Sequence, residues 1–251
     1  MPKAPSPPTI LRAAVNQWTG SAATSGVWSA TGSLLKTFWE FLYESTPSRL
    51  RQRYGDADYD WDYRVNTTSA AVGWRDRLIG LLNSPYQPTE PELFHEMLGG
   101  LRQVALLDFR EFTFLDLGSG KGRTLLMASD YPFSRIVGVE LLPNLNQIAE
   151  ENLRQYKSGS QQCLRVESIC GDATNFPLPP EPLIIYLFNP FPEAGLRGFL
   201  ENLRRSLKER PRRVYLLYHN ALLEKVVDGS GLLQKIGGTH QYSIFKAKDP
   251  P

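Results

Sequence analysis

The chain reads FTFLDLGSGKGR from Phe112 to Arg123, an apolar and aromatic run followed by three closely spaced glycines. The run predicts a short buried strand, and the glycines predict a tight loop before a helix that starts near Thr124. Glycine has no Cβ, so its backbone can turn sharply and lie close to a ligand. A strand, a glycine loop and a helix in this order are typical of α/β proteins that bind nucleotides.

Strand and helix patterns alternate along the last two thirds of the chain. This alternation predicts an α/β sheet with right-handed crossovers, in which ligands bind beyond the carboxyl ends of the strands. The expected strands are 112–117, 135–140, 168–171, 183–188, 213–218 and 242–247. The expected helices are one after Pro88 that ends at or soon after Gly99-Gly100, and others near 124–129, 143–153 and 196–207.

The first third of the chain differs in composition, because it holds all five tryptophans. We predict a loose arm over residues 1–33, a helical cap and lead-in segment over 34–110, and the α/β domain over 111–251. Within the cap, Asp56, Asp58, Asp60 and Asp62 alternate with aromatic residues, as in an extended, solvated acidic loop. A calcium loop is excluded because Trp61 and Thr67 stand where a glycine and a glutamate are required.

Composition restricts the partners and the compartment. Lys plus Arg number 28 against 26 Asp plus Glu, so no strong net charge favours nucleic acid or anionic lipid. The longest apolar run, Leu183 to Phe188, is far shorter than the roughly 18–20 residues of a membrane span. Two cysteines and three scattered histidines predict neither a disulfide scaffold nor a metal site. His219 and Asn220 follow the predicted strand 213–218 at the ligand edge, where they could contact a substrate or only form a turn. We expect a cytoplasmic protein, with an organellar targeting role for the acid-free residues 1–39 as the minor alternative.

Two phosphate-binding fingerprints fail at the glycine loop. The dinucleotide pattern G-x-G-x-x-G, counted from Gly118, would need a third glycine where Arg123 stands. The P-loop pattern, with its Gly-Lys-Ser/Thr, does not occur in the chain. A nicotinamide-dependent oxidoreductase nevertheless stays open as an alternative, because it shares the strand, the glycine loop and the acid described next.

Acidic residues stand at the ends of three consecutive predicted strands. Asp116 precedes the glycine loop, Glu140 ends the next strand, and Asp172 follows the third. A carboxylate at the second position can accept hydrogen bonds from both hydroxyls of an adenosine ribose. A carboxylate at the third position could bind the exocyclic amine of adenine. The joint placement is far more specific than any one of the acids.

Four motifs resemble those of class I S-adenosylmethionine-dependent methyltransferases in order and spacing. They are DLGSGKG from Asp116, GVE at 138–140, GDA at 171–173 and FNPF at 188–191. The resemblance covers about residues 83–247 and implies a Rossmann-like, doubly wound, seven-stranded sheet whose last strand, 242–247, is antiparallel and inserted. It also implies S-adenosylmethionine as methyl donor, bound by Tyr86, Thr89, Asp116, Gly118, Ser119, Gly120, Glu140, Leu141, Asp172, Ala173 and Asn189.

The resemblance assigns roles to these residues. Asp116 would lie near the methionine amino group of the donor, and Glu140 would bind the ribose. Asp172 and Ala173 would contact adenine, while the loop from Gly118 to Gly120 would pass under the donor.

A finer resemblance lies upstream of the glycine loop. Residues 86–89 read YQPT and, with Glu92, Leu93 and Met97, are similar to the same region of non-SET lysine methyltransferases and of related bacterial methyltransferase-like proteins. There, the tyrosine and the threonine fold over the donor.

The motif Asn189-Pro190-Phe191 resembles the Asn/Asp-Pro-Pro-aromatic motif of amino-methylating enzymes. It has one proline before the aromatic residue instead of two. This departure argues against a nucleobase as methyl acceptor more than it argues against amines in general. The alternative is a turn that merely ends the strand.

These observations predict methyl transfer to an amine nitrogen of a protein lysine or a small molecule, with no nucleic-acid partner. The acceptor would be positioned by Tyr86, Asn189, Phe191 and Tyr218, and a cap containing Trp61, Trp74 and Tyr86 would enclose it. A non-catalytic module that binds S-adenosylmethionine is the further alternative.

Overall fold

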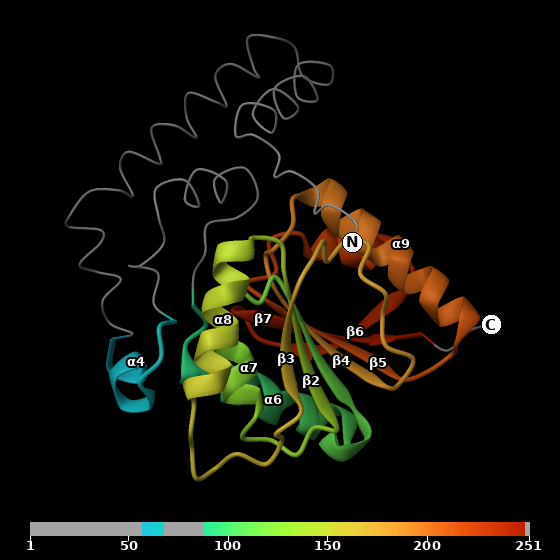
Figure 1. Ribbon diagram of the computed structural model, residues 1–251. Coiled ribbons are helices and arrows are strands. Elements are labelled where there is room, and N and C mark those ends of the chain that lie inside the picture. The colour runs from blue at the N-terminus through green and yellow to red at the C-terminus, as the bar shows by residue number, and fades with distance from the viewer. Residues whose placement is uncertain (1–56, 68–87, 249–251) are drawn as a thin grey trace. The chain divides into compact units, whose positions relative to one another are not determined.

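A seven-stranded sheet forms the centre of the computed structural model, which describes residues 57–67 and 88–248 (Figure 1). The strand order is β3-β2-β1-β4-β5-β7-β6, and β7 runs antiparallel to both neighbours. The predicted fold class and the inserted last strand are therefore confirmed. The strands are β1 (Thr113–Leu117), β2 (Arg135–Glu140), β3 (Val166–Cys170), β4 (Leu183–Phe188), β5 (Val214–His219), β6 (Leu233–Gly238) and β7 (Tyr242–Ala247).

The register of the parallel strands aligns their carboxyl ends along one edge of the sheet. Asp116 in β1 lies opposite Gly138 in β2 and Tyr186 in β4, while Phe188 lies opposite His219 in β5. After β3 the chain returns to the centre of the sheet and adds β4 on the other side of β1. The strand order therefore reverses between β1 and β4. In open α/β sheets, such a reversal of strand order marks the position where ligands bind.

Helices cover both faces of the sheet (Figure 1). One face packs against α6 (Pro91–Ala105), α7 (Arg123–Ala128) and α8 (Pro143–Gln155), and the other packs against α9 (Glu193–Glu209) and α10 (Glu224–Gly229). Alternate strand residues point to opposite faces, so Phe114 joins the α6 side and Leu115 the α9 side. None of the helices in the described ranges is long and apolar enough to cross a membrane.

Helix α6 continues past Gly99-Gly100, at or soon after which its end was expected. A Cβ on Gly100 would lie 2.9 Å from the hydroxyl oxygen of Tyr242, so this glycine allows the helix to lie close to β7. The helix instead ends at Ala105, after which Leu106 adopts a left-handed conformation. Strand β6 and helix α10 were not anticipated, because both are short and bury few side chains.

The acidic segment is helical, which corrects the expectation of an extended loop. Helix α4 (Ala57–Tyr63) turns Asp60 toward the α/β domain, where it accepts hydrogen bonds from Thr67. Trp61 is 85% exposed, so it does not line an enclosed pocket within the described residues. The predicted arm 1–33, Trp74 and Tyr86 lie outside the described residues.

Candidate functional site

The glycine loop after β1 folds against the end of β2. The backbone N–H groups of Gly118 and Ser119 donate to the carbonyl oxygen of Val139, at 2.8 and 3.1 Å. Gly118 has φ +87°, and a Cβ there would lie 2.5 Å from the Cβ of Pro190. The loop therefore contacts the turn that follows β4, and only glycine fits at this position.

Gly138 in β2 permits a second close approach. A Cβ at this position would lie 2.6 Å from a methyl carbon of Leu125 and 2.7 Å from the hydroxyl oxygen of Ser119. The first turn of α7 and the glycine loop consequently lie directly on β2.

Glu140 has a fixed orientation at the end of β2. Its Oε2 accepts a hydrogen bond from the backbone N–H of Gly120, and its Oε1 accepts one from Leu142, each at 2.8 Å. Burial raises the pKa of this carboxyl group, although the backbone N–H donors lower it in part. Each carboxylate oxygen retains a further lone pair, so the group can still accept two ribose hydroxyls.

Asp116 is a buried acid, 2% exposed. Burial raises its pKa to about 7, while a hydrogen bond from the Thr124 hydroxyl acts in the opposite direction. No Lys or Arg of the described ranges forms an ion pair with it. A buried carboxylate is stabilised by a cation, and the ammonium group of a donor's methionine moiety fits that requirement.

The remaining predicted donor residues lie around this edge. Leu141, beside Glu140, is 51% exposed and offers an apolar surface. Asp172 is exposed, and its Oδ1 accepts hydrogen bonds from the backbone N–H and hydroxyl of Thr174. Ala173 is buried on the α9 side. The hydroxyl of Ser119 is buried and makes no hydrogen bond to the described residues.

Asn189 carries an unsatisfied hydrogen-bond acceptor. It has φ +44°, and its Nδ2 donates to the backbone carbonyl of Asn220 at 2.6 Å. A carbonyl oxygen can only accept, so the orientation of the amide is fixed. The Oδ1 atom is buried without a partner in the described part of the chain. Leaving such an atom unpaired costs free energy, which a ligand donor would recover.

Phe191 and Tyr218, two predicted acceptor-positioning residues, pack on the α9 side of the sheet. Phe191 stacks on Phe199 of α9, with ring centroids 6.1 Å apart, and Tyr218 is buried in the same cluster. Strand alternation explains the difference, because Tyr218 points to the α9 side and its neighbour His219 to the α6 side.

A buried polar chain that the sequence analysis missed joins three elements. The Tyr186 hydroxyl hydrogen-bonds to the hydroxyl of Thr89 at 2.7 Å and to Nδ1 of His219 at 2.8 Å. Burial lowers the pKa of His219 to about 4, so the imidazole is neutral at pH 7. The alternation of strand residues could have revealed this chain. Tyr186 is the register partner of Asp116, and His219 is the register partner of Phe188, two residues after Tyr186, so these side chains point to one face.

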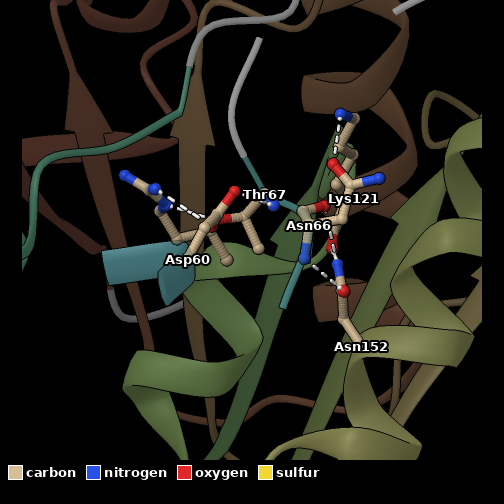
Figure 2. Close-up of polar contacts among 6 residues, drawn as sticks. Asp60, Asn66, Thr67, Lys121 and Asn152 are labelled. Atoms are coloured by element: carbon tan, nitrogen blue, oxygen red, sulfur yellow. Dashed lines mark hydrogen bonds and ion pairs between the residues drawn. The ribbon is translucent and has the colours of Figure 1, made fainter. Parts of the chain in front are cut away.

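Residues 57–67, which we call the strap, bind the chain directly after the glycine loop (Figure 2). Arg123 is 2% exposed; its Nε donates to the Thr67 hydroxyl at 2.6 Å, and its guanidinium lies 3.4 Å from Asp60. Its guanidinium carbon also lies 4.8 Å from the ring centre of Tyr59. No local sequence signal links Arg123 to Asp60, because the two residues lie 63 positions apart in the chain.

Lys121 makes the second connection between the strap and the loop. Its Nζ donates to Oδ1 of Asn66 at 3.0 Å. Asn152 of α8 bridges the two segments, since its Nδ2 donates to the carbonyl oxygens of both Asn66 and Lys121 (Figure 2). Burial lowers the pKa of Lys121 to about 8. Lys121 and Arg123 therefore both contact the strap.

Comparison with known proteins gives one family match and several solved structures with similar folds. Residues 114–210 match the family described as "Methyltransferase domain". No match was found among curated proteins. Solved structures with similar folds include the PH0226 protein from Pyrococcus horikoshii OT3, at 17% identity over 62% of this chain and 91% of that one, with a TM-score of 0.44.

Two further structures are similar at this level. An RNA methyltransferase from Salinibacter ruber in complex with S-adenosyl-L-homocysteine is 21% identical over 65% of this chain and 94% of that one, with a TM-score of 0.39. The glycopeptide N-methyltransferase MtfA complexed with S-adenosylmethionine is 13% identical over 66% of this chain and 96% of that one, with a TM-score of 0.45.

Residues 114–210 therefore match a methyltransferase domain, and they lie within a seven-stranded sheet of Rossmann-like order. The oxidoreductase alternative requires a third glycine where Arg123 stands, and the Arg123 side chain is buried against the strap.

Proposed function

We propose that this chain is an S-adenosylmethionine-dependent methyltransferase that transfers a methyl group to the amine nitrogen of a protein lysine or of a small molecule. The amine would hydrogen-bond to Asn189. The observation that carries the proposal is the buried Oδ1 of Asn189, which has no partner in the described residues. An amine N–H would donate a hydrogen bond to this oxygen. A methyl acceptor that cannot donate a hydrogen bond would leave the oxygen unpaired.

The donor would lie along the ends of β1, β2 and β3, within the catalytic domain over residues 111–251. Glu140 binds the ribose, Asp116 the methionine ammonium, and the Gly118–Gly120 backbone lies beneath the donor. Leu141, Asp172 and Ala173 form the adenine end, and Ser119, Thr89 and Tyr86 complete the donor site. The contact between Gly118 and Pro190 supports this arrangement, because it brings the donor loop beside the acceptor-binding turn.

The chemistry requires mainly alignment. The donor supplies a methyl group on a sulfonium, and in-line attack by the neutral amine forms the N–C bond as the C–S bond breaks, with the electron pair going to sulfur. Asn189 accepts one N–H of the amine and so directs its lone pair toward the methyl carbon. An ammonium acceptor must first lose a proton to solvent.

The experiment is a methyl-incorporation screen with isotopically labelled S-adenosylmethionine. Its arms are lysine-containing peptides, small primary amines and transfer RNA. We expect incorporation into an amine arm, and a loss of activity of about 100-fold in the Asn189→Ala variant at a saturating donor concentration. Saturation removes any effect of Asn189 on donor affinity. Incorporation only into RNA, or full activity of Asn189→Ala, would refute the proposal. A non-catalytic module predicts donor binding with no incorporation in any arm.

A further inference from the structure

Asn189 and His219 lie side by side at the ends of neighbouring strands. Phe188 and His219 are paired in the register of β4 and β5, and the Asn189 amide donates to the carbonyl of Asn220. His219 points to the same face of the sheet as Tyr186, which lies opposite Asp116. The imidazole therefore lies at the same edge as the donor loop and the unsatisfied Asn189 oxygen.

The orientation of the His219 ring is fixed from two sides. Nδ1 is bonded to the Tyr186 hydroxyl, which is in turn bonded to Thr89. The ring also stacks on Phe188, with centroids 3.8 Å apart and planes 22° apart. These contacts use Nδ1 and one ring face. The second nitrogen, Nε2, makes no hydrogen bond to any residue of the described ranges.

We propose that Nε2 of His219 is the second hydrogen-bond acceptor for the amine, so that a primary amine is held by two N–H groups, one on Asn189 and one on His219. This inference rests on the proposed function and narrows it to a substrate class. When both N–H groups are hydrogen-bonded, the orientation of the amine is fixed, and its nitrogen lone pair points to the methyl group of the donor. A secondary amine has one N–H and loses one contact, so the enzyme favours primary amines and releases monomethylated product.

The proposal fixes the proton positions along the buried chain. For Nε2 to accept, Nδ1 must carry the proton and donate to the Tyr186 oxygen, and the Tyr186 hydroxyl must donate to Thr89. Tyr186 stays protonated, since burial raises its pKa well above the usual value. Burial also keeps the imidazole neutral, which an acceptor nitrogen requires.

The binding test uses S-adenosylhomocysteine and sinefungin, so it needs no knowledge of the natural acceptor. In sinefungin an amine-bearing carbon replaces the methyl-bearing sulfur of S-adenosylmethionine, so the amino group lies where the methyl group would be. The ratio of the sinefungin and S-adenosylhomocysteine affinities therefore reports on hydrogen-bond acceptors beside the methyl group. The variants are a matched pair. His219→Asn retains a polar atom at the Nδ1 position, whereas His219→Gln reaches the Nε2 position.

We expect wild type and His219→Gln to bind sinefungin more tightly than S-adenosylhomocysteine. In His219→Asn, the ratio of sinefungin affinity to S-adenosylhomocysteine affinity should fall about 10-fold, while the affinity for S-adenosylhomocysteine stays unchanged. A purely structural role for His219 predicts the reverse pattern, with Asn tolerated and Gln not. Retention of the preference in His219→Asn would overturn the proposal.

Two controls separate this inference from the proposed function. If Asn189→Ala loses the sinefungin preference and His219→Asn keeps it, the amine assignment stands and the His219 contact is refuted. If wild type fails to bind S-adenosylhomocysteine, both are refuted. Nitrogen NMR of the wild-type imidazole provides a test without a variant, because a proton on Nε2 instead of Nδ1 contradicts the proposal.

Discussion

Replacing Asp60 with alanine removes the acid that connects the strap to the donor loop. Asp60 accepts the backbone N–H and the hydroxyl of Thr67 and lies 3.4 Å from the Arg123 guanidinium. Arg123 begins α7, directly after the glycine loop. The variant therefore removes this carboxylate from beside the buried Arg123 guanidinium and removes the two hydrogen bonds that Asp60 accepts from Thr67.

The magnitude follows from the burial of the pair. Removing one partner of a buried ion pair costs about 3–5 kcal/mol. The Asp60 side chain is 14% exposed and Arg123 keeps its contacts with Thr67 and Tyr59, so we take the lower end, about 3 kcal/mol. For a chain of this size, such a loss lowers Tm by roughly 6–12 °C.

The assay is thermal unfolding followed by circular dichroism, with hydrogen exchange over residues 57–67 and calorimetric donor binding on the same samples. The matched control is Asp62→Ala, because Asp62 is exposed on the same helix and should change stability by less than about 0.5 kcal/mol. We expect Asp60→Ala to lower Tm, to increase exchange in the strap and to weaken donor binding. Wild-type values of all three would refute the role given to the strap.

Further predictions concern the donor loop and its buried acid. Gly118→Ala should weaken donor binding by more than about 10-fold. A side chain at φ +87° is strained by about 1–2 kcal/mol, and its Cβ would overlap Pro190. The control in the same calorimetric assay is Gly159→Ala, because the space around Gly159 is open. Asp116, with its pKa raised to about 7, binds a proton in the folded state at pH values where the unfolded chain has released it, so its contribution to stability falls as pH rises from about 4 to 7. A donor ammonium favours the charged carboxylate, so donor affinity should fall as pH drops below 7, and this pH dependence should be absent in Asp116→Asn; a pH-independent wild-type affinity would contradict the assignment.

Most of the sheet could be predicted because its central strands carry strong local patterns. The run from Leu183 to Phe188 is apolar throughout, as a strand buried on both faces requires, and β4 has those bounds in the structure. Strand β6 was missed because it lies at the sheet edge and buries only Leu233 fully. Gly99 and Gly100 resemble a helix end in the sequence, but Gly100 instead allows α6 to lie close to Tyr242 of β7. This contact between distant residues cannot be predicted from the local sequence.

The candidate site divides in the same way. Asp116 and Glu140 could be placed from sequence, because they follow recognisable strands and share one edge. The strap could not, because the connection between Asp60 and Arg123 depends on a fold that brings distant segments together. His219 was expected at the ligand edge, but Tyr218 was preferred for the acceptor contact. One residue of strand alternation decides which of the two side chains shares a face with Tyr186.

The central claim is that the carboxyl edge of β1 and β2 binds S-adenosylmethionine, and calorimetry tests it most directly. S-adenosylmethionine and S-adenosylhomocysteine should bind wild type, with a nicotinamide dinucleotide as the negative control. Glu140→Ala removes the hydrogen bonds of a charged group to the ribose, worth about 3 kcal/mol together, so affinity should fall roughly 100-fold. Circular dichroism on each sample confirms folding. Failure of folded wild type to bind either sulfur ligand, or binding of the nicotinamide dinucleotide instead, would contradict the account.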